Sequence, residues 1–432
     1  MHITSKNKID IIMNTFNFTF LAISEATEMS ISSENDQNPI ITELLMVFVK
    51  EVDDVNLKLN IEVLQQNTEE LRRKIDFIVQ KYKEHDQKIH RLNTYFSKLK
   101  DGEYFFILPT KDIPKEQCFQ LYNYLLSLER GEDFGEMSKE IEKLFGELRS
   151  SYEMLAYNGN TKKGIGETDK SKRICRFCNK SYPEVSFKKV AHSISEALGN
   201  KKIITNDECD TCNEKFGKGI ENDLILFLDF FRIFFGVKGK KGVPKLKGKN
   251  FEITNTGEIK IKQTLTDDEI KDLEHDVPRL ELKSTQDIIF QNIYKTLSKY
   301  ALSVINRSQI TDFNDTIAWI NGVKNMANLP KIAMLTSNDF FSPHPSIIVY
   351  LRKNNETKLP FAVAEFRFTS LIFVYIIPGS SKDSKDFTNE EDYKYFWNFF
   401  KHYNSVHNWS FLKMNDDVPR KFVMIIDFNK KK

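Results

Sequence analysis

The chain of 432 residues is 40% hydrophobic and 29% charged, enough for a large buried core and for two or three domains. Its 63 basic and 61 acidic side chains leave a net charge of +2, which excludes a histone-like polycation and restricts nucleic-acid contact to a local patch. The longest apolar stretch, residues 224–237, is too short for a bilayer and contains Asp229 and Arg232. Residues 1–22 also lack a secretory signal pattern, so we predict a cytoplasmic protein with no membrane contact.

The N-terminal third is predicted to be a helical arm. Residues 1–40 are expected to be disordered or weakly ordered, and residues 41–157 to form a helical coiled coil. No proline occurs between Pro39 and Pro109, and apolar or tolerated residues recur at alternating steps of three and four, which is typical of a long coiled-coil helix. The predicted seam consists of Leu57, Ile61, Leu64, Thr68, Leu71, Ile75, Ile78, Tyr82, His85, Ile89, Leu92, Phe96 and Leu99.

A narrow apolar seam of this length must be buried against another helix. In the first alternative the partner helix belongs to a second copy of the chain, which predicts a homo-oligomer through the arm. The other is intramolecular, because further helices are predicted at about 114–128, with proline in the first turn, and at about 136–155. Both alternatives remain open from the sequence.

Three further segments follow the arm, and together they predict an α+β fold class. Residues 158–173 are glycine-rich, polar and aperiodic, as in a linker. Residues 174–250 form a cysteine-bearing central domain, and residues 251–432 an α+β domain of sensing or regulatory role. The elements expected in this last domain are a hairpin at 251–264, helices at 285–305 and 312–323, and strands at 346–351, 361–368, 371–377 and 422–428.

Four of the five cysteines form two Cys-x-x-Cys pairs, Cys175/Cys178 and Cys209/Cys212, and Cys118 stands alone. Two such pairs can present four thiolates tetrahedrally to Zn²⁺ and close a structural site with no open position for substrate. Redox dithiols or buried free cysteines would explain one pair, but not two. The sequence therefore predicts a structural zinc site in a reducing compartment.

The residues around the second pair add a further pattern. His192 ends a β-like run, a turn follows, Asn213 stands directly after Cys212, and an amphipathic helix comes next. This order resembles the HNH (ββα-metal) endonucleases that carry a four-cysteine zinc site. The resemblance covers about residues 174–249 and implies that His192 is the general base and that Asn213 holds the surrounding β-hairpin.

The resemblance also implies a catalytic divalent ion, Mg²⁺ or Mn²⁺. Its ligands would come from the helix after the second pair, where Asn222 falls on the family's third motif position and Glu221 is an adjacent oxygen donor. Many family members carry a metal ligand immediately before the base, whereas this chain has Ala191; Glu196 could substitute. The remaining acidic residues near the second pair are expected to be solvated. They are Glu208, Asp210 and Glu214.

A lysine-rich strip follows the helix. Residues 158–250 contain 20 basic and 11 acidic side chains, although the whole chain is nearly neutral. Lysine and glycine in a flexible strip suit phosphate-backbone contact without base readout, so we predict DNA as the partner. The expected DNA contacts are Lys238, Lys240, Lys241, Lys245, Lys247 and Lys249.

The leading hypothesis is a metal-dependent HNH endonuclease that hydrolyses phosphodiester bonds in DNA. By resemblance of architecture, its setting is bacterial anti-phage defence, with additional defence-system proteins as partners. The alternatives are a non-catalytic zinc module that binds nucleic acid and a coiled-coil assembly protein whose zinc is purely structural. Glu365 and Arg367 in a predicted strand resemble half of a carboxylate nuclease site, but without the accompanying aspartate and lysine we interpret them as structural.

Overall fold

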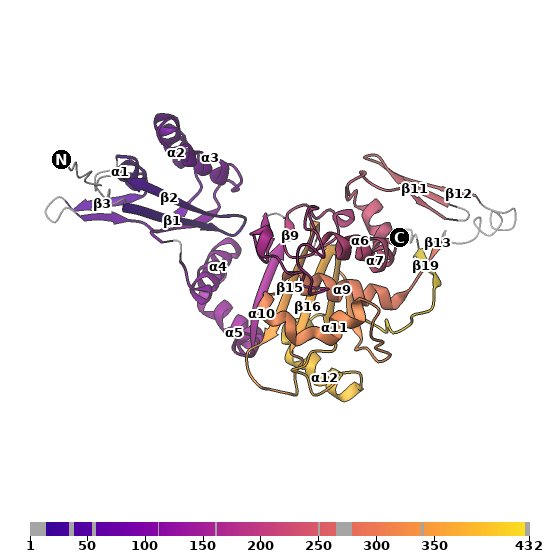
Figure 1. The fold of residues 1–432 in the computed structure, drawn as a ribbon. Helices are drawn as coiled ribbons and strands as arrows, with labels where there is room; N and C mark the ends of the chain where they lie inside the picture. The colour runs from indigo at the N-terminus through magenta and orange to yellow at the C-terminus, as the bar shows by residue number, and fades with distance from the viewer. Residues whose placement is uncertain are drawn as a thin grey trace, which may run out of the picture. The chain divides into compact units, whose positions relative to one another are not determined.

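The computed structural model describes residues 14–33, 39–53, 58–110, 112–159, 162–248, 251–264, 279–337 and 341–427. The chain divides into two compact units, residues 1–143 and 144–432 (Figure 1). None of the helices in the described ranges has the length and apolar character needed to cross a membrane. Mixed helices and strands in both units agree with the predicted α+β class.

The first unit is built on an antiparallel sheet with strand order β2-β1-β6-β5. Residues 14–33, expected to be weakly ordered, form its first two strands, because Phe18, Phe20 and Ile31 are buried in the core of this unit. The strands are β1 (Asn14–Ala22), β2 (Ala26–Ser33), β5 (Leu64–Gln66) and β6 (Tyr104–Leu108), with a separate pair β3 (Val49–Asp53) and β4 (Lys58–Ile61).

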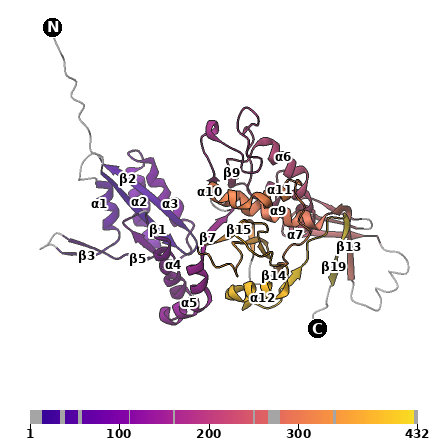
Figure 2. The same ribbon diagram turned by 60° about the horizontal axis from the view of Figure 1, so that its bottom comes forward.

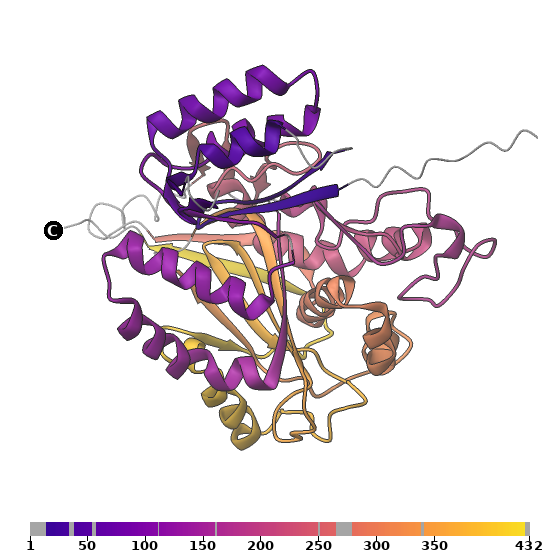
Figure 3. The ribbon, with the colours of Figure 1, turned by 90° about the vertical axis from the view of Figure 1, so that its left-hand side faces the viewer.

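Short helices accompany this sheet, and Figure 3 shows α2 and α3 lying over one of its faces. The helices of the unit are α1 (Pro39–Met46), α2 (Glu69–Tyr82), the 3-10 helix η1 (Gln87–Ile89), α3 (His90–Phe96) and α4 (Lys115–Arg130). Helix α4 agrees with the helix predicted near 114–128. Helix α5 (Phe134–Ser151) leads from the first unit into the second.

The single long helix predicted through the seam is wrong. Residues 58–61 and 64–66 are strands, and α2 begins only after Thr68, whose side-chain oxygen accepts a hydrogen bond from the Leu71 N–H. Thr68 is therefore an N-cap and no seam position. Helix α2 ends at Tyr82, and Asp86 caps a new 3-10 turn four residues later. Leu57 lies outside the described residues.

The seam is instead filled within the chain. Leu71, Ile75 and Ile78 of α2 pack with α3 and with the phenylalanines of β1 and β6 in one core. Ring contacts such as Phe20 with Phe96, at 5.9 Å between centroids, fix this arrangement. The heptad spacing therefore reflects the apolar faces of two short helices, and the argument for self-association through the seam no longer holds.

We expect Ile75→Asp to destabilise the first unit. It should not convert an oligomer into monomers, because the residue packs within its own chain. Ile75 has no exposed surface, and burying a carboxylate in place of its side chain costs about 4 kcal/mol or more. Thermal melting and sedimentation measure the two effects. The exposed Phe77 on the same helix supplies the control variant Phe77→Asp, which should melt near the wild-type temperature. A stable Ile75→Asp protein of reduced mass would restore the coiled-coil interpretation.

The second unit contains a six-stranded antiparallel sheet of order β18-β14-β17-β16-β15-β7. The helix predicted at 136–155 ends at Ser151, because residues 152–158 form an edge strand whose Tyr157 pairs with Ile347. The strands are β7 (Tyr152–Asn158), β14 (Ile332–Thr336), β15 (Ser342–Arg352), β16 (Ala362–Thr369), β17 (Leu371–Ile376) and β18 (Ser410–Leu412).

Both faces of this sheet are covered, as Figure 2 shows for α9 and α12. Alternation along β15 explains why: Val349 and Leu351 enter one core and Tyr350 another. Helix α9 (Phe290–Val304) covers the first face, and α12 (Glu390–Phe399) with α13 (Lys401–Asn404) covers the second. The remaining elements near α9 are α10 (Arg307–Ile310), the 3-10 turn η4 (Thr311–Phe313) and α11 (Asn314–Ile320).

The cysteine-bearing segment lies on the α9 side of the sheet and shares its core. Cys175, Phe216 and Leu228 belong to the same buried cluster as Leu297 and Val349. The chain therefore does not divide at residue 250, where we predicted a domain boundary. The segment contains η2 (Lys170–Lys172), η3 (Glu196–Leu198), β9 (Ile203–Thr205), α6 (Asp210–Lys218), α7 (Ile220–Phe234) and β10 (Leu246–Lys247).

The predicted linker also belongs to this structure. Its residues Lys163–Ile165 form β8, which pairs in parallel with β9, and Arg173 donates hydrogen bonds to the carbonyls of Glu167 and Thr168. Beyond the segment, the predicted hairpin is confirmed as β11 (Phe251–Asn255) and β12 (Ile259–Gln263). A separate pair consists of β13 (Arg279–Ile288) and β19 (Arg420–Asp427).

Candidate nuclease site

The four paired cysteines come together in the second unit. Each offers a sulfur, and the four sulfurs all lie within 4.8 Å of one another. Cys175 and Cys178 belong to a turn, whereas Cys209 is the N-cap of α6 and accepts a hydrogen bond from the Cys212 N–H at 3.4 Å. The helix start thus fixes the second pair, and the fold brings the first pair to it.

The geometry and chemistry of this cluster fit zinc. The Sγ atoms of Cys178 and Cys209 are 3.8 Å apart, which equals the edge of about 3.8 Å expected for a tetrahedron with Zn–S bonds of about 2.3 Å. The hydrogen bond from the Cys212 thiol lowers the pKa of Cys175, whereas the same bond raises the pKa of Cys212 and burial raises the pKa of Cys209, so these sulfurs share their protons as one group. The four cysteines therefore form the close cluster that their spacing predicts, and its geometry fits zinc.

Buried charges attach the turn that contains Cys175 and Cys178, here called the first knuckle, to α9. Arg176, between the two cysteines, is buried and donates to the Asp207 carboxylate at 2.8 Å and to the Leu302 carbonyl at 2.7 Å. Because Leu302 lies in the last turn of α9, the guanidinium binds carbonyls that the helix leaves unpaired. The knuckle is thus fixed both to its neighbouring loop and to the C-terminal part of the chain.

His192 lies on a short β-hairpin beside the cluster. It forms a bridge with Ile204, and the hydrogen bonds Ser193 N–H to Ile203 O (3.0 Å) and Thr205 N–H to Ala191 O (2.9 Å) flank it. The imidazole is partly buried. With α6 following the hairpin, these elements have the strand–strand–helix order that the resemblance implies.

The residue that holds this hairpin is Asn200, which the sequence analysis missed. Its buried amide donates to the carbonyls of Ile194 (2.8 Å) and Ile203 (2.9 Å), and its oxygen accepts from the N–H of Ile203 (3.0 Å). Among the described contacts, no hydrogen bond joins the side chain of Asn213, to which we had given this role, to the hairpin. The only available signal was Gly-Asn in the turn after the histidine.

The electrostatic surroundings favour a neutral His192. Burial lowers the pKa of His192 below its usual value, and the positive charges of Lys299 and Lys240 lower it further, whereas Glu196 and Glu221 oppose the shift. The imidazole is therefore unprotonated at pH 7 and can accept a proton.

The two predicted metal-binding residues have different surroundings. Glu221, at the start of α7, faces inward with 9% of its side chain exposed, while the neighbouring Asn222 is exposed to solvent. The negative charge of Glu221 raises the pKa of His192, whereas Asn222 carries no charge. Glu196, the substitute considered for Ala191, also acts on His192. Carboxylate oxygens are ligands that a hard divalent cation prefers, but among the described residues only the four cysteines form a group of three or more side chains close enough to hold a metal ion.

Glu208 and Lys299 form a buried ionic cluster with Glu221. The Lys299 Nζ lies 3.1 Å from a carboxylate oxygen of Glu208 and 3.1 Å from one of Glu221. Glu208, expected to be solvated, is buried, and burial raises its pKa to about 7. Burial alone would lower the pKa of Lys299, but the two carboxylates outweigh it and raise that pKa.

The lysine strip begins next to the hairpin. A Cβ at Gly239 would lie 3.1 Å from the Cα of Ala197, so the strip packs against η3, and the charge of Lys240 acts on His192. The described lysines of the strip are exposed, and Lys249 lies outside the described residues. The exposed lysines are Lys238, Lys240, Lys241, Lys245 and Lys247.

Strand β12 adds two lysines that the sequence analysis did not assign. Lys262 pairs with Glu252, which pairs in turn with Lys247, so the three side chains form a row across the sheet β10-β11-β12. Lys260 lies two residues from Lys262 and therefore on the same face. The opposite face packs on α7 through Phe251 and Ile253. The lysines are thus presented to solvent on one side of the sheet.

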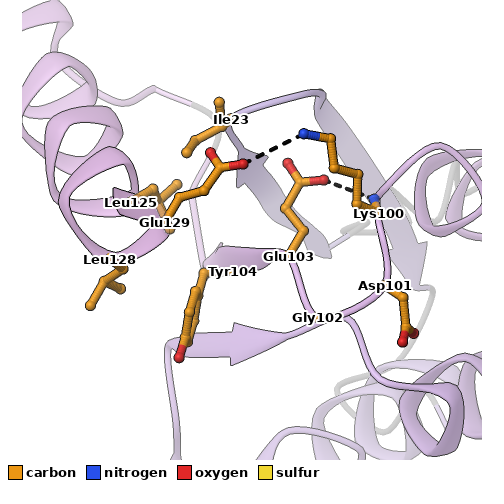
Figure 4. A pocket seen from close by; sticks show the side chains of 9 residues that line it. All are labelled: Ile23, Lys100, Asp101, Gly102, Glu103, Tyr104, Leu125, Leu128 and Glu129. Carbon is orange, nitrogen blue, oxygen red and sulfur yellow. Dashed lines mark hydrogen bonds and ion pairs between the residues drawn. The ribbon is translucent and has the colours of Figure 1, made fainter. Parts of the chain in front are cut away.

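Two other features carry no part of this site. Glu365 is buried and bonded to Arg367 and to the Tyr403 hydroxyl, which agrees with a structural role. A pocket of about 220 Å³ in the first unit (Figure 4) has its charged groups already paired: Glu103 accepts from the Lys100 N–H at 2.9 Å, and the Lys100 ammonium lies 3.5 Å from Glu129.

Comparison with known proteins agrees with this geometry. A family model described as HNH endonuclease matches residues 175–226. The matched segment begins at the first cysteine of the cluster, includes His192 and ends within α7. Comparisons of the chain with curated proteins and with solved structures give no match. Residues 175–226 therefore match the HNH endonuclease family, and the four cysteines within them lie close enough together to hold one metal ion.

Proposed function

We propose that the protein is a metal-dependent endonuclease that hydrolyses phosphodiester bonds in DNA. The observation that carries this proposal is His192, a neutral imidazole on the hairpin of an HNH segment, within electrostatic reach of both a carboxylate, Glu221, and a lysine, Lys240. A base, an oxygen ligand for a cation and a phosphate-binding charge are the three groups that phosphodiester hydrolysis requires.

In this mechanism the His192 imidazole accepts a proton from the attacking water, which makes the water nucleophilic. Glu221, together with Glu196, would hold Mg²⁺ or Mn²⁺, which neutralises charge on the phosphate oxygens when bound. Lys240 attracts the phosphate to the hairpin. The four cysteines only support the fold, because zinc bound by four thiolates leaves no position for substrate.

The second candidate is a zinc module that binds nucleic acid without cutting it. The observation that favours it is Ala191, since many HNH enzymes have a metal ligand at this position. Incubation of the purified protein with supercoiled plasmid and either Mg²⁺ or Mn²⁺ separates the two candidates. Nicked or linear products that disappear with excess chelator support the endonuclease, and unchanged plasmid under conditions where the protein binds DNA supports the module.

Neutralising lysines next to His192 should weaken DNA binding and reduce its salt dependence. For Lys240→Gln with Lys241→Gln, the slope of log affinity against log salt should fall by about 0.9 for each phosphate that the variant no longer neutralises. Fluorescence anisotropy with a labelled duplex measures both quantities. The same change at Lys358 and Lys394, which are exposed and outside the strip, is the control. Equal slopes for both double variants would show that the strip does not contact phosphate.

Strand β12 should contribute to the same surface. Lys260→Gln with Lys262→Gln is expected to lower the salt slope by a similar amount, because both side chains lie in the exposed lysine face of the sheet. Cleavage of bound DNA should continue, since neither lysine is among the charges acting on His192. An unchanged slope would limit the interface to the strip.

A further inference from the structure

Lys299 is a buried cation that joins three parts of the second unit. It comes from α9, well outside the matched residues 175–226, and its side chain has no exposed surface. Its ammonium contacts Glu208, which directly precedes a zinc-site cysteine, and Glu221, at the start of α7. The aromatic rings of Phe177 and Phe216 lie 5.9 Å from the same nitrogen. The HNH segment is thus completed by a charge from another part of the chain.

Stability alone gives a weak reason for this cluster. Removing charges from water costs several kcal/mol per ion, and apolar or neutral groups of the same size often stabilise a core as well. The cluster does have an effect next to the cleavage site, because the charges of both Lys299 and Glu221 act on His192. The ammonium lies 3.1 Å from Oε1 of Glu221, an ion-pair distance, so this end of the carboxylate faces a buried positive charge.

We propose that Lys299 is a positioning residue of the nuclease site, which holds Glu221 by one oxygen and leaves the other for the catalytic divalent ion. This inference rests on the proposed function for the role of Glu221. Partners that orient a metal ligand typically change metal affinity by about 10- to 100-fold when they are removed. The C-terminal part of the chain, through α9, would thereby control the affinity of the nuclease site for its metal.

The test uses the full-length, zinc-loaded protein and Mn²⁺ as the probe. Lys299→Met alone leaves two buried carboxylates without a partner and is expected to be unstable. The decisive variant is therefore Lys299→Met with Glu208→Gln, which removes one charge of each sign. Lys295→Met, the same substitution one turn earlier on α9 where the side chain is partly exposed, is the matched control. Zinc content and melting temperature establish that each variant is folded.

Titration of free Mn²⁺ by electron paramagnetic resonance measures binding without relying on activity. We expect the double variant to bind Mn²⁺ at least about tenfold more weakly than wild type, as Glu221→Gln also should, and Lys295→Met to bind it normally. Plasmid cleavage by the double variant should fall similarly and partly recover at high Mn²⁺. Wild-type Mn²⁺ affinity in a folded double variant would overturn the inference.

The inference and the proposed function can fail separately. A wild-type protein that never cuts DNA, yet loses Mn²⁺ affinity when Lys299 is changed, would contradict the nuclease proposal and retain the positioning role. A wild-type protein that cuts DNA, with a double variant of unchanged metal dependence, would leave the nuclease proposal intact and make Lys299 a structural residue.

Discussion

Replacing His192 with alanine is expected to reduce metal-dependent DNA cleavage by about 10²-fold or more, the usual contribution of a positioned general base. DNA affinity should change little, because the phosphate contacts are assigned to the lysines. Zinc content should also persist, since the four cysteines are untouched and the His192 side chain is only partly buried. Single-turnover cleavage, anisotropy and metal analysis measure these three quantities.

His407→Ala is the matched control, because His407 is an exposed histidine of the same unit. It should cut DNA at the wild-type rate. If His192→Ala retains full cleavage after a contaminating nuclease has been excluded, His192 is not the base and the binding-module alternative takes precedence.

The dependence of cleavage on pH provides a second measurement of the same residue. Because burial lowers the pKa of His192, the active, unprotonated imidazole should persist through neutral pH. Activity should be lost only as the pH falls through this lowered pKa, so the acidic midpoint should lie below the ordinary histidine value of about 6.5. A midpoint above that value would contradict the electrostatic surroundings described for His192.

The second large effect is expected at the zinc site. Cys209→Ser should reduce bound zinc from about one per chain to nearly none and unfold much of the second unit. A structural zinc contributes on the order of 10 kcal/mol to folding, and this cysteine is also the N-cap of α6. Cys175, Cys209 and Cys212 belong to the core shared with α9 and the sheet, so the destabilisation should extend beyond the knuckles.

Cys118→Ser is the control for this change, because Cys118 is the one cysteine outside the cluster and lies in the first unit. It should keep both zinc and stability. Calorimetry can separate the units, and the transition of the first unit should be unaffected by Cys209→Ser. A zinc-free protein that remains folded and cuts DNA would contradict the assignment of the four cysteines.

The spacing of the seam residues led to the largest error, for a physical reason. Apolar residues at steps of three and four identify one face of a helix, but they do not say how long the helix is or what covers it. Ile75 and Leu92 both lie on such faces, in two helices with a break between them. Thr68 caps the start of the first helix, and Asp86 caps the turn that begins after the break; a count of heptads considers neither.

Some features could be predicted from the sequence because they depend on residues that are close together along the chain. Two Cys-x-x-Cys pairs can serve one metal ion because each pair places two sulfurs in a single turn, and the hairpin turning at Asn255–Gly257 is likewise specified by its own residues. The order of cysteines, His192 and Asn213 was enough to identify the HNH segment. Each cysteine pair and the hairpin turn are local signals, whose distances the backbone determines, whereas the fold brings the two pairs together.

Only the tertiary structure decided which side chains meet across long separations. Lys299 reaches Glu208 and Glu221 because α9 packs against α7 and the knuckles, and no residue near Lys299 in the sequence indicates this. Likewise, Glu221 and Asn222 are adjacent oxygen donors in the sequence, but one is buried and the other exposed, because the helix turns about 100° per residue and only one can face the core. The sequence thus determined the chemical groups of the site, and the packing of distant segments decided which of them act together.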